Sequence, residues 1–216
     1  MSSQVQRTST FRRSIQPILA LLLVATAGMA QAQSSNWRFL VGVGVADGGE
    51  TITSGNIVTD GTNKLTPYTI KAGGGTQLRA GLEYRLMDRL SLQGSLGYVV
   101  SDPMGYNGSL TYTAVPVEFM AFLNVTESLR VGAGVRKTHG ELKGTGVASA
   151  WSVNGTYTGS AAGVVEAQYL FGSGDAKTSA QRTQFGISIR AVNETLTHDG
   201  LSINGNHYEV GAALYF

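Results

Sequence analysis

Hydrophobic and polar residues alternate with a period of two along eight segments of this chain. Successive residues of a β-strand face opposite sides of the sheet, so each segment predicts a strand with one apolar face and one mixed face. In the clearest segment the residues between the apolar ones are polar or glycine, and the apolar set is Leu78, Ala80, Leu82, Tyr84 and Leu86. The predicted strands cover residues 37–46, 76–86, 90–100, 111–123, 129–137, 161–171, 183–192 and 207–216.

The fourth predicted strand contains a proline. Its alternation places Val117 and Phe119 on the apolar face and Glu118 on the other, with Pro116 directly before them. Proline has no backbone N–H, so it removes one hydrogen bond from a sheet ladder. The sequence therefore predicts a bulge or a bend at Pro116.

The connections between the predicted strands alternate in length. Residues 87–89 and 124–128 are short, whereas 47–75 and 138–160 are long and rich in glycine, serine and threonine. No segment after the N-terminal region has 18 consecutive apolar residues, so a membrane could be crossed only by a closed sheet. These patterns predict an all-β fold, an eight-stranded antiparallel up-and-down transmembrane β-barrel. The alternative is a soluble, secreted β-barrel that binds a ligand.

Outward aromatic residues mark the two ends of this predicted barrel. Trp37 and Phe39 begin the first strand, and Tyr98 and Tyr208 lie near the opposite ends of their strands. Aromatic rings of this kind favour the interfaces between a bilayer and water. A soluble core does not explain why strand ends, rather than strand centres, are aromatic.

The first 32 residues read as a cleavable signal peptide. Three arginines precede an apolar run of about ten residues, which is shorter than the roughly 20 that a membrane-spanning helix needs. A small-residue cleavage pattern then ends at Ala32. The predicted domains are therefore a signal peptide at 1–32 and a barrel domain at 33–216.

Charge and cysteine content exclude several functions. The predicted signal peptide carries Arg7, Arg12 and Arg13 and no acidic residue, so its removal changes the formal net charge from +2 to −1. A nucleic-acid-binding surface needs a clustered positive excess, which the remaining chain does not have. The chain contains no cysteine, which excludes disulfides and thiolate metal sites.

The mixed faces of the predicted strands carry charged residues that would point into the barrel. An eight-stranded barrel has an interior just wide enough for side chains to fill it. Buried charges are costly unless they are paired, so we expect a packed network, with a gated or narrow conducting path as the alternative. The predicted interior set is Arg38, Arg79, Glu83, Arg85, Glu118, Arg130, Arg136, Glu166, Arg190 and Glu209.

The signal peptide, the eight alternating strands, the unequal loops and the final residues Tyr215 and Phe216 resemble the small outer-membrane barrels of OmpA, OmpX and OmpW type. The resemblance covers residues 37–216. It implies location in the bacterial outer membrane, contact with outer-membrane lipids and lipopolysaccharide, and passage through periplasmic chaperones and the assembly machinery. It also implies that Phe216 acts as an assembly signal. The sequence does not determine the oligomeric state, and we expect a monomer.

The sequence favours a non-enzymatic structural or surface-interaction protein with no cofactor, no metal and no nucleic-acid partner. A narrow OmpW-like channel for small or hydrophobic solutes is the first alternative. A lipid A-modifying enzyme is a weaker one, because it would have to assemble a site from His139, His198 and His207, which no regular spacing brings together.

Overall fold

The computed structural model describes residues 36–58, 65–105, 108–172 and 183–216. The predicted signal peptide, residues 1–32, lies outside these ranges, so its cleavage and the boundary between 1–32 and 33–216 stay predictions. Among the described residues, no helix has the length and apolar character needed to cross a membrane.

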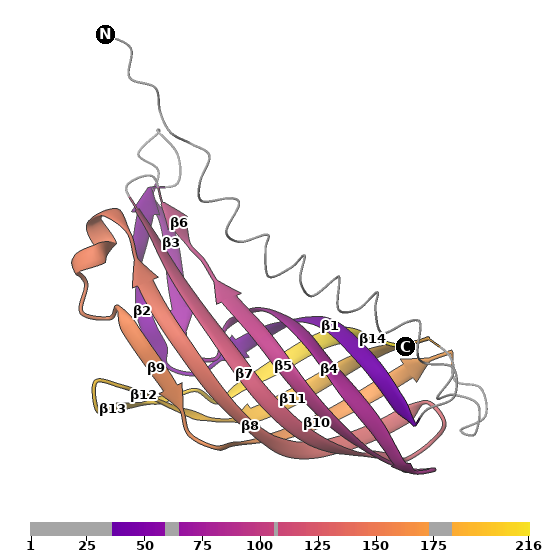
Figure 1. The fold of residues 1–216 in the computed structure, drawn as a ribbon. Coiled ribbons are helices and arrows are strands. Elements are labelled where there is room, and N and C mark those ends of the chain that lie inside the picture. Colours follow the sequence, from indigo (N-terminus) through magenta and orange to yellow (C-terminus); the bar gives the residue numbers. More distant parts are fainter. Residues whose placement is uncertain (1–35, 59–64, 106–107, 173–182) are drawn as a thin grey trace.

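Eight long strands form a closed antiparallel sheet (Figure 1). They are β1 (Trp37–Gly48), β4 (Gly75–Met87), β5 (Leu90–Ser101), β7 (Gly108–Asn124), β8 (Leu129–Gly144), β10 (Ala162–Phe171), β11 (Gln184–Asn193) and β14 (His207–Tyr215). Each pairs with the next in this order, and β14 pairs with β1 to close the barrel. The predicted eight-stranded antiparallel barrel is confirmed.

Shorter elements occupy the connections that the sequence analysis assigned to loops. They are β2 (Thr51–Val58), β3 (Leu65–Lys71), β6 (Met104–Gly105), the 3₁₀ helix η1 (Gly146–Ala150), β9 (Gly155–Gly159), β12 (Thr195–His198) and β13 (Leu201–Asn204). β2 pairs with β3, while β9, β12 and β13 continue the sheet beyond β8. Figure 1 shows these elements gathered at one end of the barrel, here called the hairpin end. The opposite end carries the C-terminus and is called the short-turn end.

The predicted inside and outside faces are correct. Leu82, Val131 and Ile187 point outward and are 42%, 42% and 46% exposed, so they do not share a dry core. The intervening side chains of β10 and β11, among them Glu166 and Arg190, are buried in the lumen. The barrel is therefore apolar on the outside and charged on the inside, the reverse of a soluble β-protein.

Outward aromatic rings contact one another at the short-turn end. The ring centroids of Trp37 and Tyr84 lie 4.7 Å apart, and Phe171 lies 5.7 Å from Phe185 on the neighbouring strand. These rings form part of the aromatic belt that the sequence predicts at a bilayer interface.

Pro116 interrupts the ladder without causing the predicted bulge. The pairing of β5 with β7 omits Gly97 and Tyr98 but has the same register on both sides of the gap. A Cβ added at Gly97 would lie 2.6 Å from Cγ of Pro116. The glycine therefore gives the proline ring the space it needs on the inner face, and no extra residue is inserted.

A separate hydrophobic core fills the hairpin end. It joins the parts of β5, β7 and β8 nearest the hairpin end to the short hairpins. Its largest fully buried side chains include Tyr112, Tyr157 and Leu142. The ring of Tyr157 packs edge-on against Tyr112 and stacks on His198 at 4.3 Å. The short hairpins are thus packed onto the barrel rather than left as open loops.

Substitution of Leu82 by arginine tests the outward register. Leu82→Arg, which places an arginine against the bilayer midplane, should lower the free energy of unfolding by about 2 to 4 kcal/mol. Leu86→Arg, which places one near the interface, should lower it by only about 0 to 1 kcal/mol. The measurement is reversible denaturant unfolding in lipid vesicles, with Leu86→Arg at the short-turn end as the matched control. Equal stability of Leu82→Arg and the unsubstituted barrel would contradict the assigned register.

Candidate functional site in the barrel interior

Among the described residues, the lumen buries arginines and glutamates in equal numbers. Five arginines and five glutamates are buried: Arg38, Arg79, Arg130, Arg136, Arg190, Glu83, Glu118, Glu166, Glu194 and Glu209. Nine of the ten predicted interior residues are in this set. The tenth, Arg85, lies half-buried at the short-turn end, and Glu194 takes its place in the buried set. The sequence count of six cations against four anions is therefore corrected to five of each.

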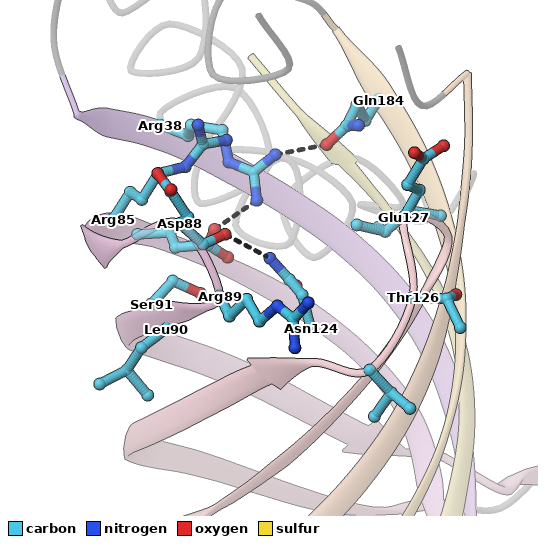
Figure 2. Close-up of a pocket in the computed structure, with 13 residues that line it drawn as sticks. Arg38, Arg85, Asp88, Arg89, Leu90, Ser91, Asn124, Thr126, Glu127 and Gln184 are labelled. Atoms are coloured by element: carbon cyan, nitrogen blue, oxygen red, sulfur yellow. Dashed lines mark hydrogen bonds and ion pairs between the residues drawn. The ribbon is translucent and has the colours of Figure 1, made fainter. Parts of the chain in front are cut away.

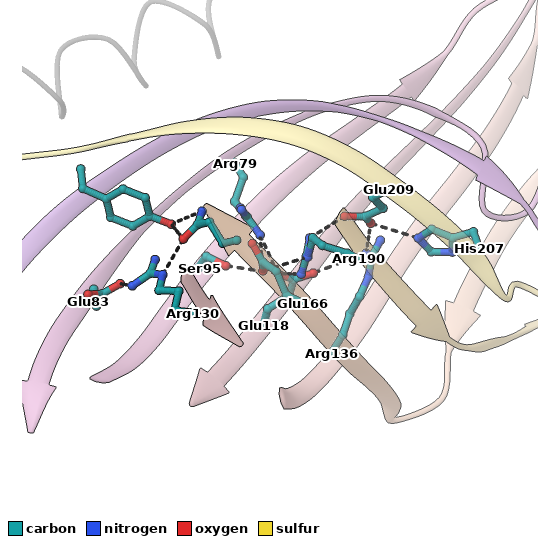
Figure 3. A network of polar contacts seen from close by, with 12 residues as sticks. Arg79, Glu83, Ser95, Glu118, Arg130, Arg136, Glu166, Arg190, His207 and Glu209 are labelled. Carbon is teal, nitrogen blue, oxygen red and sulfur yellow. Dashed lines mark hydrogen bonds and ion pairs between the residues drawn. The ribbon is translucent and has the colours of Figure 1, made fainter. Parts of the chain in front are cut away.

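Arg190 on β11 and Glu118 on β7 form the centre of the larger cluster (Figure 3). Their nearest atoms, Nη2 and Oε2, are 2.6 Å apart, and Nη1 of Arg190 also donates to Oε2 of Glu209 at 2.5 Å. Nε of Arg190 lies 3.2 Å from Glu166. One guanidinium group thus contacts carboxylates from three other strands.

Arg136 and Arg79 extend this cluster around the lumen. Nη1 of Arg136 donates to Oε1 of Glu209 at 2.6 Å and to Glu118 at 3.4 Å. Arg79 lies 3.6 Å from Glu166 and 3.8 Å from Glu118. Because the partners come from strands on all sides, the contacts tie opposite walls of the barrel together.

Glu194 was missed because it follows β11 and falls in a predicted loop. It is buried, and its Oε2 lies 3.8 Å from Nε of Arg136. The alternation nevertheless continues past the end of β11, because Val192, Glu194 and Leu196 are all buried. Extending the inward set of β11 by two residues would have identified Glu194 from the sequence.

A smaller cluster lies nearer the short-turn end and is centred on Glu83. Its carboxylate binds Arg38 on one side and Nη1 of Arg130 at 2.7 Å on the other. Arg38 also donates to Gln184. The Arg130 guanidinium lies 4.7 Å above the ring of Tyr215, which adds a cation–π contact.

Glycine on β8 makes room for this smaller cluster. The Arg130 guanidinium also lies 4.3 Å from the Phe122 ring centroid. A Cβ at Gly132 would be 2.5 Å from Cε1 of Phe122. The absence of a side chain at Gly132 allows an aromatic ring inside the barrel, directly under the arginine.

The three histidines do not form a common site. His139 points outward from β8, and His198 stacks on Tyr157 at the hairpin end. His207 lies in the lumen, with Nδ1 2.7 Å from the Gly205 carbonyl oxygen and Nε2 3.0 Å from Glu209. Its ring can donate to both oxygens only when both nitrogens carry a proton. Among the described residues, no group of three histidine, aspartate or glutamate side chains could hold a metal ion.

A polar cavity of about 320 Å³ opens at the short-turn end (Figure 2). Buried Arg38 and Gln184 lie at its inner side, and Arg89, Asp88 and Asn124 surround its mouth. Its wall includes the hydroxyl of Ser91, which is buried and has no hydrogen-bond partner among the described residues. The cavity is therefore a polar vestibule in front of the Glu83 cluster.

The solved structures that resemble this chain include proteins that align with it over nearly their whole length. No protein-family model matches the chain, and no curated protein sequence matches it. Ail of Yersinia pestis, solved with the heparin analogue sucrose octasulfate, is 14% identical over 83% of this chain and 99% of its own, with a TM-score of 0.50. Neisserial surface protein A is 9% identical over 84% of this chain and 96% of its own, with a TM-score of 0.49.

The apolar exterior, the charged interior and this fold together define the class. The chain is a small eight-stranded β-barrel of the outer membrane of Gram-negative bacteria. In barrels of this class the short turns face the periplasm and the longer connections face outward. We therefore expect the short-turn end to be periplasmic and the hairpin end to be extracellular.

A double-mutant cycle on Glu118 and Arg190 tests whether the interior acts as one balanced network. Removing one partner leaves an uncompensated buried charge, so Glu118→Met and Arg190→Met should each lower the free energy of unfolding by about 3 to 5 kcal/mol. The double variant restores the balance and should lose less than the sum of the two. Denaturant unfolding in vesicles measures all three, with Arg85→Met as a control that should lose less than either single variant. Strictly additive losses would show that the two residues act independently.

Proposed function

We propose that this barrel is a non-enzymatic outer-membrane protein with a closed lumen, whose ordered extracellular end meets partners at the cell surface. The observation that carries the proposal is the filling of the lumen at two successive levels. The charge network and two small apolar clusters, one around Phe122 and one around Leu170, occupy the membrane-spanning part, and the larger hydrophobic core occupies the extracellular part. Both levels support a role as a scaffold rather than as a wide pore.

The extracellular end is an ordered surface that a partner could contact. β7 has 17 residues and β8 has 16, whereas about 9 to 11 residues suffice to span a bilayer. Side-chain bonds brace the connection between β8 and β9, where Asn154 accepts from the backbone N–H of Gly144 at 2.6 Å and donates to the carbonyl of Ala148 at 2.8 Å. Exposed Trp151 and Leu201 offer apolar contacts on this end.

The partners proposed for the barrel itself are outer-membrane lipids, including lipopolysaccharide, and during biogenesis the periplasmic chaperones and assembly machinery. We propose a monomer, since the barrel closes within one chain. The sheet closes between β1 and β14 beside Phe216. The backbone N–H of Phe216 donates to the Phe39 carbonyl at 3.0 Å, and its ring stacks on Phe39.

Deletion of Phe216 tests its proposed role as an assembly signal. We expect slower assembly and a lower amount of the protein in the outer membrane, measured by fractionation and by the mobility shift between unheated and heated samples. A Phe216→Tyr variant, which keeps an aromatic residue, should assemble normally. Normal assembly of the deletion variant in cells would remove the proposed signal without affecting the barrel fold.

Electrical recording in planar bilayers tests the closed lumen. The purified barrel should insert without producing discrete conductance steps, because paired side chains and the hydrophobic core block the path at two levels. A water-filled porin in the same bilayer serves as the positive control. Reproducible steps from the barrel would contradict the proposal.

Such steps would favour the second candidate function, a narrow channel. The observation that supports it is the vestibule, whose wall includes the unpartnered hydroxyl of Ser91. Further buried polar atoms of the lumen, both those of Gln93 and Nη2 of Arg130, also have no hydrogen-bond partner among the described residues. A channel would have to extend this polar path past Arg190 and then through the extracellular core. Conductance that changes in Arg130→Gln would identify the path.

A further inference from the structure

A hollow of about 530 Å³ lies in the outer wall where β10, β11 and β14 approach the extracellular end. Its floor is formed by small outward residues. Ala133 on β8 and Ala191 on β11 pair with Val165 from either side, and Gly163 lies two residues from Val165 on β10. Tyr208 on β14 pairs with Ala191 and forms a raised edge.

No described side chain fills the hollow at Gly163. A Cβ added there would have no heavy atom within 4 Å, so the position opens onto free space. The neighbouring outward residues Val165, Ile189 and Val135 are exposed and apolar. The hollow is therefore a depression in the lipid-facing surface, where an acyl chain is the natural neighbour.

A cation lies at the extracellular side of the hollow. On β8 the outward residues change from Val135 to Lys137, His139, Glu141 and Lys143, so the apolar surface ends between Val135 and Lys137. Two residues of a strand span about 7 Å, so Lys137 lies on the extracellular side of the row of Val135 and Gly163, where the apolar surface of β8 ends. Lys137 has no ion pair and no side-chain hydrogen bond with any described residue.

We propose that this hollow is a binding site for one lipid A molecule of the outer leaflet, with an acyl chain against Gly163 and a phosphate bound by Lys137. The inference deepens the proposed contact with outer-membrane lipids and rests on it. Lipid A fits because the site combines an apolar depression with a cation that has no partner among the described residues, and this cation lies where the apolar surface of β8 ends. The polar edge formed by Asn193 can contact the sugar headgroup.

The experiment measures retained lipid by native mass spectrometry of the barrel purified from outer membranes and mixed with lipid A. The filling variant is Gly163→Leu, and the matched control is Gly94→Leu, since Gly94 faces lipid on β5 and also has free space in front of it but does not line the hollow. We expect the control to bind one lipid A as tightly as the unsubstituted barrel and Gly163→Leu to bind at least tenfold more weakly.

Lys137→Gln separates the headgroup from the acyl chain. It should weaken binding of lipid A about tenfold and leave binding of dephosphorylated lipid A unchanged. Phosphatidylglycerol, an anionic lipid with a different headgroup, should bind more weakly than lipid A. Equal binding of both lipids, or full binding by Gly163→Leu, would overturn the proposal.

Two further outcomes are decisive. Absence of heat-dependent mobility would show that Gly163→Leu does not fold. In that case Ala191→Leu, which fills the same hollow from the neighbouring strand, is used instead, and it should bind lipid A at least tenfold more weakly than the unsubstituted barrel. A dimer that Gly163→Leu converts to a monomer would assign the hollow to a contact between two copies and overturn the lipid site. The conductance measurement reports on the closed lumen separately, so failure of the lipid site leaves that test intact.

Discussion

A bilayer offers no partner to a backbone N–H or C=O, and this constraint governs the whole structure. The sheet must close on itself, because an open edge in hydrocarbon would leave a row of unsatisfied groups. Closure divides every strand into lipid-facing and lumen-facing residues, and a lumen bounded by eight strands is too narrow to leave those residues in water. Packing and pairing of the lumen-facing side chains follow directly from the closed sheet.

Charge balance in the lumen is a consequence of this confinement. A charge that cannot reach water needs a partner, and each buried guanidinium has more donors than one carboxylate can satisfy. Arg190 and Arg136 therefore share Glu118 and Glu209, while Glu83 is shared by Arg38 and Arg130. Shared partners couple strands that are distant in sequence, so the network holds the barrel in one arrangement as well as filling it.

The strands and the direction of their side chains could be predicted from the sequence because a period of two is a local property. Glu194 was missed because the predicted strand ended at residue 192, although its alternation continues to Leu196. Arg85 was placed too deep because the period of two does not report the distance of a residue from the end of the barrel. The short hairpins were also missed, since β12 and β13 have four residues each and gain their stability from a core that joins Leu196 to Tyr157 and Tyr112. The alternation predicted which residues share a face, but not how far from the barrel mouth each of them lies.

The two fillings of the lumen differ because the surroundings of the barrel differ along its axis. Inside the bilayer, two small apolar clusters share the lumen with the charge network. Lipid is as apolar as a leucine side chain, so pairing of polar groups is the interaction that lipid cannot replace there. Above the bilayer, water surrounds the barrel and the hydrophobic effect favours an apolar core. β7 follows this change within one strand: it turns Val117 outward and Glu118 inward in the bilayer, and Thr113 outward and Tyr112 inward above it. The reversal of polarity along the strand therefore locates the outer surface of the membrane on the protein.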